Sequence, residues 1–147
     1  MVSLKEINED NFRAVVGMKL EGEQSKYVAS NVYSLAQAWL YPEEAKPYAI
    51  YKEEEIVGFM MLDWDEEERE CGIWRFMIAN DQQGKGYGRK ALEYAVNRIK
   101  ETGKFDYVSL DYAPGNNVGK HLYESVGFRE TGEIEEGEII MKLDLIK

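Results

Sequence analysis

Short runs of apolar residues, several alternating with polar ones, predict seven β-strands. The last two runs, FRETGEI and EIIMKLDLI, are separated by EEG at residues 135–137, which predicts a hairpin. Together the predicted strands lie at residues 2–7, 47–52, 56–64, 71–79, 105–113, 128–134 and 138–146.

Apolar residues at helical spacing predict four helices, at residues 11–19, 25–40, 86–101 and 116–126. Asp10 is a candidate cap for the start of the first helix, and Gly127 for the end of the last. The element order is then β-αα-βββ-α-β-α-ββ. This order predicts an α/β (mixed α+β) fold, with a central mixed sheet of about seven strands flanked by about four helices.

Length, charge and cysteine content narrow the class of protein. A chain of 147 residues is expected to form a single domain, residues 1–147. Its 18 basic and 28 acidic residues give a net charge of −10, which argues against a nucleic-acid partner. The same charge favours cationic small molecules, although acidity also serves solubility alone. Without a long apolar run no membrane span is expected, and the single cysteine, Cys71, favours the cytoplasm.

The stretch QGKGYGRK, residues 83–90, holds three glycines between a predicted strand and a predicted helix. Unpaired backbone amides and the positive end of a helix dipole make such a turn an anion site, and Lys85, Arg89 and Lys90 add charge. A plain strand-to-helix turn is the alternative interpretation. The stretch lacks the Gly-Lys-Ser/Thr ending of a P-loop, and its glycine spacing differs from the Rossmann pattern.

Two motifs in this order resemble the GCN5-related N-acetyltransferase (GNAT) superfamily. Residues Gln83, Gly86 and Gly88 match Q-x-x-G-x-G, and NNVGKHLYESVGF at residues 116–128 is similar to N-x-x-A-x-x-L-Y-x-x-x-G-F. Gly119 stands at the alanine position of the second motif. The predicted element order also resembles the superfamily along essentially the whole chain.

The resemblance implies that acetyl-CoA is the co-substrate and that no metal is needed. It places the CoA pyrophosphate on the loop at residues 83–88 and the pantetheine arm along the preceding strand, where the Ile78 amide polarises the thioester carbonyl. Tyr123 matches the tyrosine that protonates the departing CoA thiolate. The implied cofactor-binding residues are Phe76, Met77, Ile78, Gln83, Gly84, Lys85, Gly86, Tyr87, Gly88, Arg89, Lys90, Asn116, Lys120 and Tyr123.

The segment at residues 21–62 resembles bacterial spermine/spermidine acetyltransferases of the BltD and PaiA type, which implies a polyamine acceptor. Carboxylates and aromatic faces suit such a polycation. The candidate acceptor-binding residues are Glu21, Glu23, Tyr27, Trp39 and Trp74, with Tyr41 and Trp64 as further aromatic candidates. Each aromatic residue also fits simple core packing.

The general base is left open, because Trp74 stands where related polyamine enzymes often carry a carboxylate. The remaining carboxylate candidates are Glu21, Glu23, Asp63, Glu70 and Asp111. His121, the only histidine, is expected on a helix surface. Other acceptors remain alternatives, namely an aminoglycoside, an amino acid, a peptide N-terminus or a lysine, as does a non-catalytic acetyl-CoA-binding module. A homodimer is expected from analogy alone.

Overall fold

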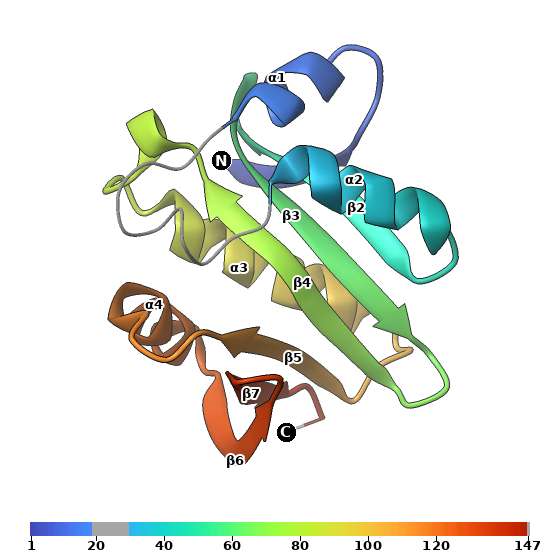
Figure 1. The fold of residues 1–147 in the computed structure, drawn as a ribbon, viewed down its shortest axis with the longest axis vertical. Coiled ribbons are helices and arrows are strands. Elements are labelled where there is room, and N and C mark those ends of the chain that lie inside the picture. Colours follow the sequence, from blue (N-terminus) through green and yellow to red (C-terminus); the bar gives the residue numbers. More distant parts are fainter. Residues whose placement is uncertain (19–29, 147) are drawn as a thin grey trace.

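A computed structural model describes residues 1–18 and 30–146, which form a seven-stranded sheet with helices on both faces (Figure 1). The strand order across the sheet is β1-β2-β3-β4-β5-β7-β6. The strands are β1 (Val2–Glu6), β2 (Ala45–Lys52), β3 (Glu55–Asp65), β4 (Glu70–Ile78), β5 (Tyr107–Tyr112), β6 (Arg129–Glu135) and β7 (Glu138–Asp144). The predicted fold class and element order are confirmed.

The helices cover the sheet unequally. They are α1 (Phe12–Gly17), α2 (Asn31–Leu40), α3 (Tyr87–Glu101) and α4 (Asn117–Val126), with a short 3-10 turn, η2, at Asn80–Gln82. α1 and α2 pack on one face of β2 and β3, over a small core that includes Phe59, Met61 and Met77. α3 packs on the other face, where Leu92 and Ile99 enter the larger core. The sheet is therefore buried between helical layers along its N-terminal half.

Helix starts differ in detail from the sequence expectation. The first helix begins after Asn11 rather than Asp10, and no side chain caps it. The Asp10 cap is therefore wrong, because the Asn8 side chain accepts the Asp10 and Asn11 amides and forms the turn itself. α2 is capped by Ser30, whose hydroxyl accepts the Tyr33 amide. The predicted residues 25–29 of this helix lie outside the described residues, whereas Gly127 ends α4 as expected.

The strands β4 and β5 form the only parallel pair in the described sheet, and they soon part. Their register covers three residue pairs, from Glu70↔Tyr107 to Gly72↔Ser109. Beyond Gly72 the two strands diverge, as Figure 1 shows, with α3 behind the opening. Among residues 1–18 and 30–146, no strand pairs with the edge of β4 that faces β5 from residue 73 onward.

Close contact between β3 and β4 depends on Gly58. This residue pairs with Ile78, and a Cβ atom placed on it would lie 2.4 Å from the backbone oxygen of Met77. Glycine is the residue that permits such an approach of two backbones. Gly58 thus fixes the position of the β4 segment that borders the opening.

The described part of the chain contains no helix that is both long enough and apolar enough to cross a membrane.

Candidate active site

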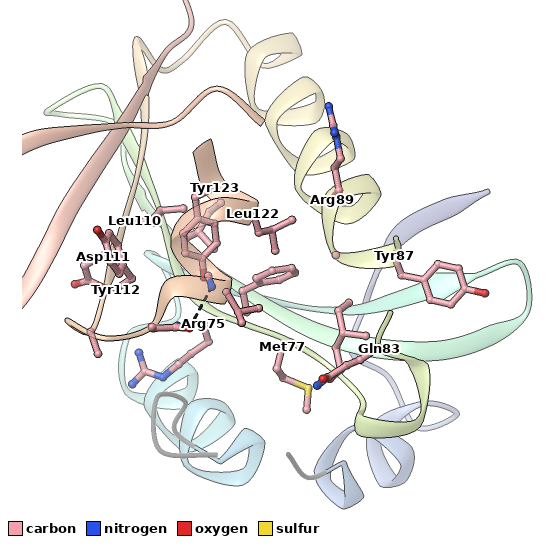
Figure 2. A pocket seen from close by; sticks show the side chains of 18 of the residues that line it. Arg75, Met77, Gln83, Tyr87, Arg89, Leu110, Asp111, Tyr112, Leu122 and Tyr123 are labelled. Atoms are coloured by element: carbon pink, nitrogen blue, oxygen red, sulfur yellow. Dashed lines mark hydrogen bonds between the residues drawn. The ribbon is translucent and has the colours of Figure 1, made fainter. Parts of the chain in front are cut away.

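The opening between β4 and β5 is a cleft with a volume of about 570 Å³. β4 forms one wall and β5 the other, while the start of α3 and the face of α4 complete it. Figure 2 shows Tyr87, Gln83 and Arg89 at one end, and Arg75 and Asp111 at the other. We call the cleft-lining residues between Gln83 and Arg89 the loop end of the cleft, and Asp111 with Glu138 its acidic end.

The loop end combines glycine backbone with the side chains of Gln83, Tyr87 and Arg89. Gly84 and Gly86 have φ angles of 79° and 82°, a left-handed conformation that favours glycine. Gln83 holds the loop against β4, because its side-chain amide donates to the Ile78 carbonyl at 3.1 Å. Gly86 caps α3, a helix of 15 residues whose first amides point out of its N-terminus. This geometry suits an anionic group such as a phosphate.

We expect Gly86→Ala to lower the free energy of unfolding by about 1–2 kcal/mol, since alanine is strained in the left-handed region. The substitution should also weaken acetyl-CoA binding by tilting the first turn of α3. Urea unfolding and calorimetric titration measure the two effects. Gly17→Ala is the matched control, because its Cβ meets nothing within 4 Å and its φ lies outside the left-handed range. Equal stability changes in the two variants would contradict the strain argument.

The free edge of β4 points backbone groups into the cleft. The Ala79 amide donates to the Val57 carbonyl of β3 at 2.8 Å. Because amides alternate in direction along a strand, those of Ile78 and Phe76 point away from β3, toward the cleft. This edge can therefore accept an extended amide-bearing chain as an additional strand, and it offers an N–H donor for a carbonyl oxygen.

A bulge in β4 changes which side chains face α2. The register passes from Met61↔Arg75 to Leu62↔Ile73, so Trp74 is an extra residue opposite β3. A bulge turns consecutive side chains toward one face. Trp74 packs on the core beneath α2 and meets the Tyr41 ring at 6.3 Å, while Arg75 donates to the Gln37 side chain at 2.8 Å. Both residues line the cleft.

Tyr123 reaches the cleft from α4. Its ring packs against Tyr112 and Phe128, with centroids 6.5 and 6.4 Å away. Its hydroxyl forms no hydrogen bond within the described part of the chain. Burial, followed by the charges of Asp111 and Glu138, raises the pKa of Tyr123 to about 12. The phenol therefore keeps its proton at neutral pH and can donate it.

Asn116 anchors the start of α4 beside the cleft. Its side chain accepts the Gly119 amide at 3.1 Å as the helix cap, and the residue is only 8% exposed. A Cβ atom on residue 119 would lie 2.7 Å from the Asn116 amide nitrogen. Gly119, at the alanine position of the motif, therefore leaves room for the Asn116 side chain.

The two carboxylates of the acidic end come from neighbouring strands, β5 and β7. Asp111 pairs in register with Ile140, and Glu138 lies two residues before Ile140, on the same face of the sheet. Burial, then the charge and hydrogen bonding of Asp111, raises the pKa of Glu138, against an opposing influence of Arg75. A second cavity of about 250 Å³ adjoins this end and shares Asp111 and Trp74 with the cleft. Asp63 and Glu70 line that second cavity.

Several residues expected at the site lie elsewhere. Lys85 donates to the Gln82 side chain at 3.2 Å, and neither it nor Lys90 or Lys120 lines the cleft. Trp39 is 84% exposed on α2, and Trp64 packs edge-on against Phe105 in the larger core. His121 is exposed on α4, as expected. Glu21, Glu23 and Tyr27 lie outside the described residues.

The other expected residues come together around the cleft. It is lined by Trp74, Phe76, Met77, Ile78, Gln83, Gly84, Gly86, Tyr87, Gly88, Arg89, Asp111, Asn116 and Tyr123. Sequence reasoning missed Arg75, Tyr112 and Glu138, which also line it. Of these, only Glu138 carries a usable sequence signal, since it belongs to the acidic run EIEEGE before the last strand. Within residues 1–18 and 30–146, no group of acidic, histidine and cysteine side chains is placed to hold a metal.

Two solved structures share this fold along nearly the whole chain. An aminoglycoside acetyltransferase in complex with coenzyme A superposes with a TM-score of 0.81 at 21% identity, covering 98% of this chain and 95% of that one. A spermidine N-acetyltransferase from Vibrio cholerae, in complex with CoA and spermine, gives a TM-score of 0.73 at 16% identity, covering 96% and 92%. At these identities, the likeness establishes the fold.

Sequence comparisons identify the family. The model of the acetyltransferase (GNAT) family matches residues 2–128. The spermine/spermidine N(1)-acetyltransferase of Bacillus subtilis (strain 168) is 29% identical over 154 residues, covering 98% of this chain and 99% of that protein. With the glycine loop, the open β4 edge and Tyr123 in one cleft, the chain is an acetyl-CoA-dependent N-acetyltransferase and belongs to the GNAT family.

Proposed function

We propose that the protein transfers the acetyl group of acetyl-CoA to a primary amine of spermine or spermidine. The observation that carries this proposal is the opposite polarity of the two ends of one cleft. Backbone amides, the α3 N-terminus and Arg89 lie at the loop end, whereas Asp111 and Glu138 lie at the acidic end. An anionic donor and a cationic acceptor can thus meet within it.

The donor end fits CoA in shape and chemistry. Residues 83–88 would bind the pyrophosphate through main-chain amides, with Arg89 adjacent. The pantetheine arm would lie along the free edge of β4, where the Ile78 amide can stabilise negative charge on the thioester oxygen. Asn116 and Tyr123 line the same space from α4. Tyr123 is placed to give its proton to the departing sulfur.

The acceptor end suits an amine that carries further positive charges. The Trp74 face and the Asp111 carboxylate border both the cleft and the second cavity. Ion pairing and cation–π contact would hold an ammonium group there. The B. subtilis relative named for spermine and spermidine matches over the full chain, which supports the same acceptor class. The net charge of −10 would also favour the approach of polycations.

The test is the initial rate of CoA release with acetyl-CoA and a panel of amines. The panel holds spermine, spermidine, a diamine, an aminoglycoside and a lysine peptide. We expect saturable turnover with spermine and spermidine, which weakens as salt screens the acidic end. Turnover confined to the aminoglycoside or the peptide would replace the proposed acceptor. Tight acetyl-CoA binding with no turnover of any amine would favour a binding module instead.

A further inference from the structure

The helix α2 is apolar on its outer face, where the surface helices of globular proteins are usually polar. Its inner face packs Leu35 and Ala38 on the small core. Beside them Asn31 and Ser34 are buried, and Asn31 donates to the Val15 carbonyl at 2.9 Å. Polar side chains of this helix therefore lie on its inner side, and large apolar ones are left for the outside.

The outer face is a single stripe, which we call the α2 patch. It consists of Val32, Tyr33, Trp39 and Leu40, each more than half exposed, with the exposed Ala36 between them. At 3.6 residues per turn, these five positions fall within about 120° of the helix circumference. In Figure 1, α2 lies on the front of the sheet and no other described element is drawn over it. A contiguous exposed apolar patch of this kind marks an interaction surface.

The charge distribution indicates what covers the α2 patch. No charged residue interrupts α2, NVYSLAQAWL, in a chain of which 31% of the residues are charged. Because two copies of a chain with a net charge of −10 repel each other, they approach at least cost where neither carries a charged side chain. If the two helices run antiparallel, Glu43 and Glu44, just beyond the end of one helix, lie near the positive N-terminus of the other.

A second copy fits the patch better than a membrane or an unrelated protein does. Helices that lie on membranes carry Lys and Arg beside their apolar side, and α2 has neither. A separate protein would leave the patch exposed whenever that protein was scarce, whereas another copy of the chain is always present at a matching concentration. Pairing of one surface with itself about a twofold axis is also the commonest arrangement of soluble oligomers.

The helix that bears the patch also supports one wall of the cleft. Gln37 accepts a hydrogen bond from Arg75 at 2.8 Å, and the Tyr41 ring, at the end of the helix, meets the Trp74 ring at 6.3 Å. Both Arg75 and Trp74 line the cleft. A contact that holds α2 in place therefore holds these two side chains as well.

We propose that the α2 patch binds the same patch of a second copy, forming a symmetric dimer, and that this contact stabilises the cleft wall formed by Trp74 and Arg75. The patch is small, since aromatic side chains bury about 150–250 Å² each and a stable interface uses roughly 800 Å² per partner. Tyr41, together with Phe12 on the neighbouring α1, is also exposed and would enlarge it. The dimer should therefore dissociate reversibly in the micromolar range.

Sedimentation velocity over a range of protein concentrations tests the interface. The wild type should pass from monomer to dimer as the concentration rises. Trp39→Glu places a negative charge in each half of the interface and should weaken dimerisation by about 100-fold or more. Ile134→Glu is the matched control, because it makes the same change at an exposed apolar position on β6, and it should weaken dimerisation by less than about threefold.

Circular dichroism and thermal unfolding verify that both variants are folded. A wild type that stays monomeric at every concentration would overturn the proposal. The same holds for a Trp39→Glu variant that dimerises as well as Ile134→Glu does.

Tryptophan fluorescence identifies what covers Trp39. Trp64 and Trp74 pack against the two cores, so the emission that acrylamide quenches most readily comes from Trp39. This quenching should fall as the dimer forms. Weak quenching in the monomer at every dilution would mean that the chain covers its own patch, and would overturn the proposal. Protection that requires phosphatidylcholine vesicles would assign the patch to a membrane and overturn it equally.

Steady-state kinetics test the link to the cleft, with an amine that the panel above shows to be acetylated. At a concentration where the wild type is dimeric, Trp39→Glu should raise the KM for the amine by about fivefold or more. The KM for acetyl-CoA should stay within about twofold, because the loop end is distant from α2. An unchanged KM for the amine in the monomeric variant would contradict the support of the cleft wall. If no amine is acetylated, the function proposed above fails, while sedimentation and quenching still decide the interface.

Discussion

Tyr123→Phe is expected to lower kcat by about 100-fold or more, while the KM for acetyl-CoA changes little. The substitution removes one oxygen and keeps the ring that packs against Tyr112 and Phe128. A pKa of about 12 means that the phenol is protonated throughout the neutral range, so that nearly every molecule carries the donor. Without it, the thiolate must leave as an anion or find a proton in water. Stopped-flow detection of free CoA thiol measures this step.

The control for this experiment is Tyr94→Phe, the same change on α3 at a position that does not line the cleft. Both variants should bind acetyl-CoA like the wild type. An acyl donor whose leaving group needs no proton tests the mechanism further. With such a donor, Tyr123→Phe should lower kcat less than it does with acetyl-CoA. A kcat for Tyr123→Phe within threefold of that for Tyr94→Phe would contradict the assignment of Tyr123 as proton donor.

Gly58→Ala is expected to destabilise the fold by about 2–3 kcal/mol or more, because the new methyl group would overlap a backbone atom. The Cβ would lie 2.4 Å from the Met77 oxygen and within 3.2 Å of the Ile50 and Ile78 side chains. Relief requires β3 and β4 to separate, which moves the cleft wall. Denaturant unfolding gives the stability loss, and acetyl-CoA titration should show weaker binding in the molecules that remain folded.

Gly72→Ala is the comparison within the same sheet. Its Cβ would meet Ser109 Oγ at 3.5 Å and Asp63 Cβ at 3.6 Å, which are ordinary contacts. We expect this variant to lose less than about 1 kcal/mol. If the two substitutions cost the same, close backbone approach at Gly58 is not the reason for its glycine.

Most of the fold could be predicted from the sequence, because apolar spacing and turn residues indicate the same helices and strands that the structure forms. The helix predicted at residues 86–101 is observed at Tyr87–Glu101, and the hairpin turns where EEG stands. Such agreement is expected where apolar periodicity and turn residues point to the same element. The predicted Asp10 cap is wrong because the Asn8 side chain accepts the Asp10 and Asn11 amides and forms the turn before α1.

The sequence offered Asp111 as one of several candidate carboxylates, but it could not bring Asp111 together with Glu138, for a geometric reason. Asp111 and Glu138 are separated by a helix and a strand, and they meet only through the register between β5 and β7. The bulge at Trp74 is likewise a property of pairing with β3, since no glycine or proline marks it. Motif spacing predicted a glycine-rich turn between a strand and a helix at residues 83–90, and the structure forms that turn with Gly84 and Gly86 in the left-handed region before α3. Helical spacing correctly predicted that Trp39 lies on a helix, α2. This spacing does not reveal which face of the helix is turned toward the cleft.

The short pairing between β4 and β5 has a mechanical consequence. The N-terminal strands and the C-terminal β5–β7–β6 group are joined within the sheet by three residue pairs, so backbone hydrogen bonding between strands is sparsest at this junction. A cofactor arm hydrogen-bonded along β4 and packed against β5 would bridge the two strands where they no longer pair. Ligand binding would then slow hydrogen exchange in β5 and β7, far from the phosphates, by adding contacts between the two halves of the sheet.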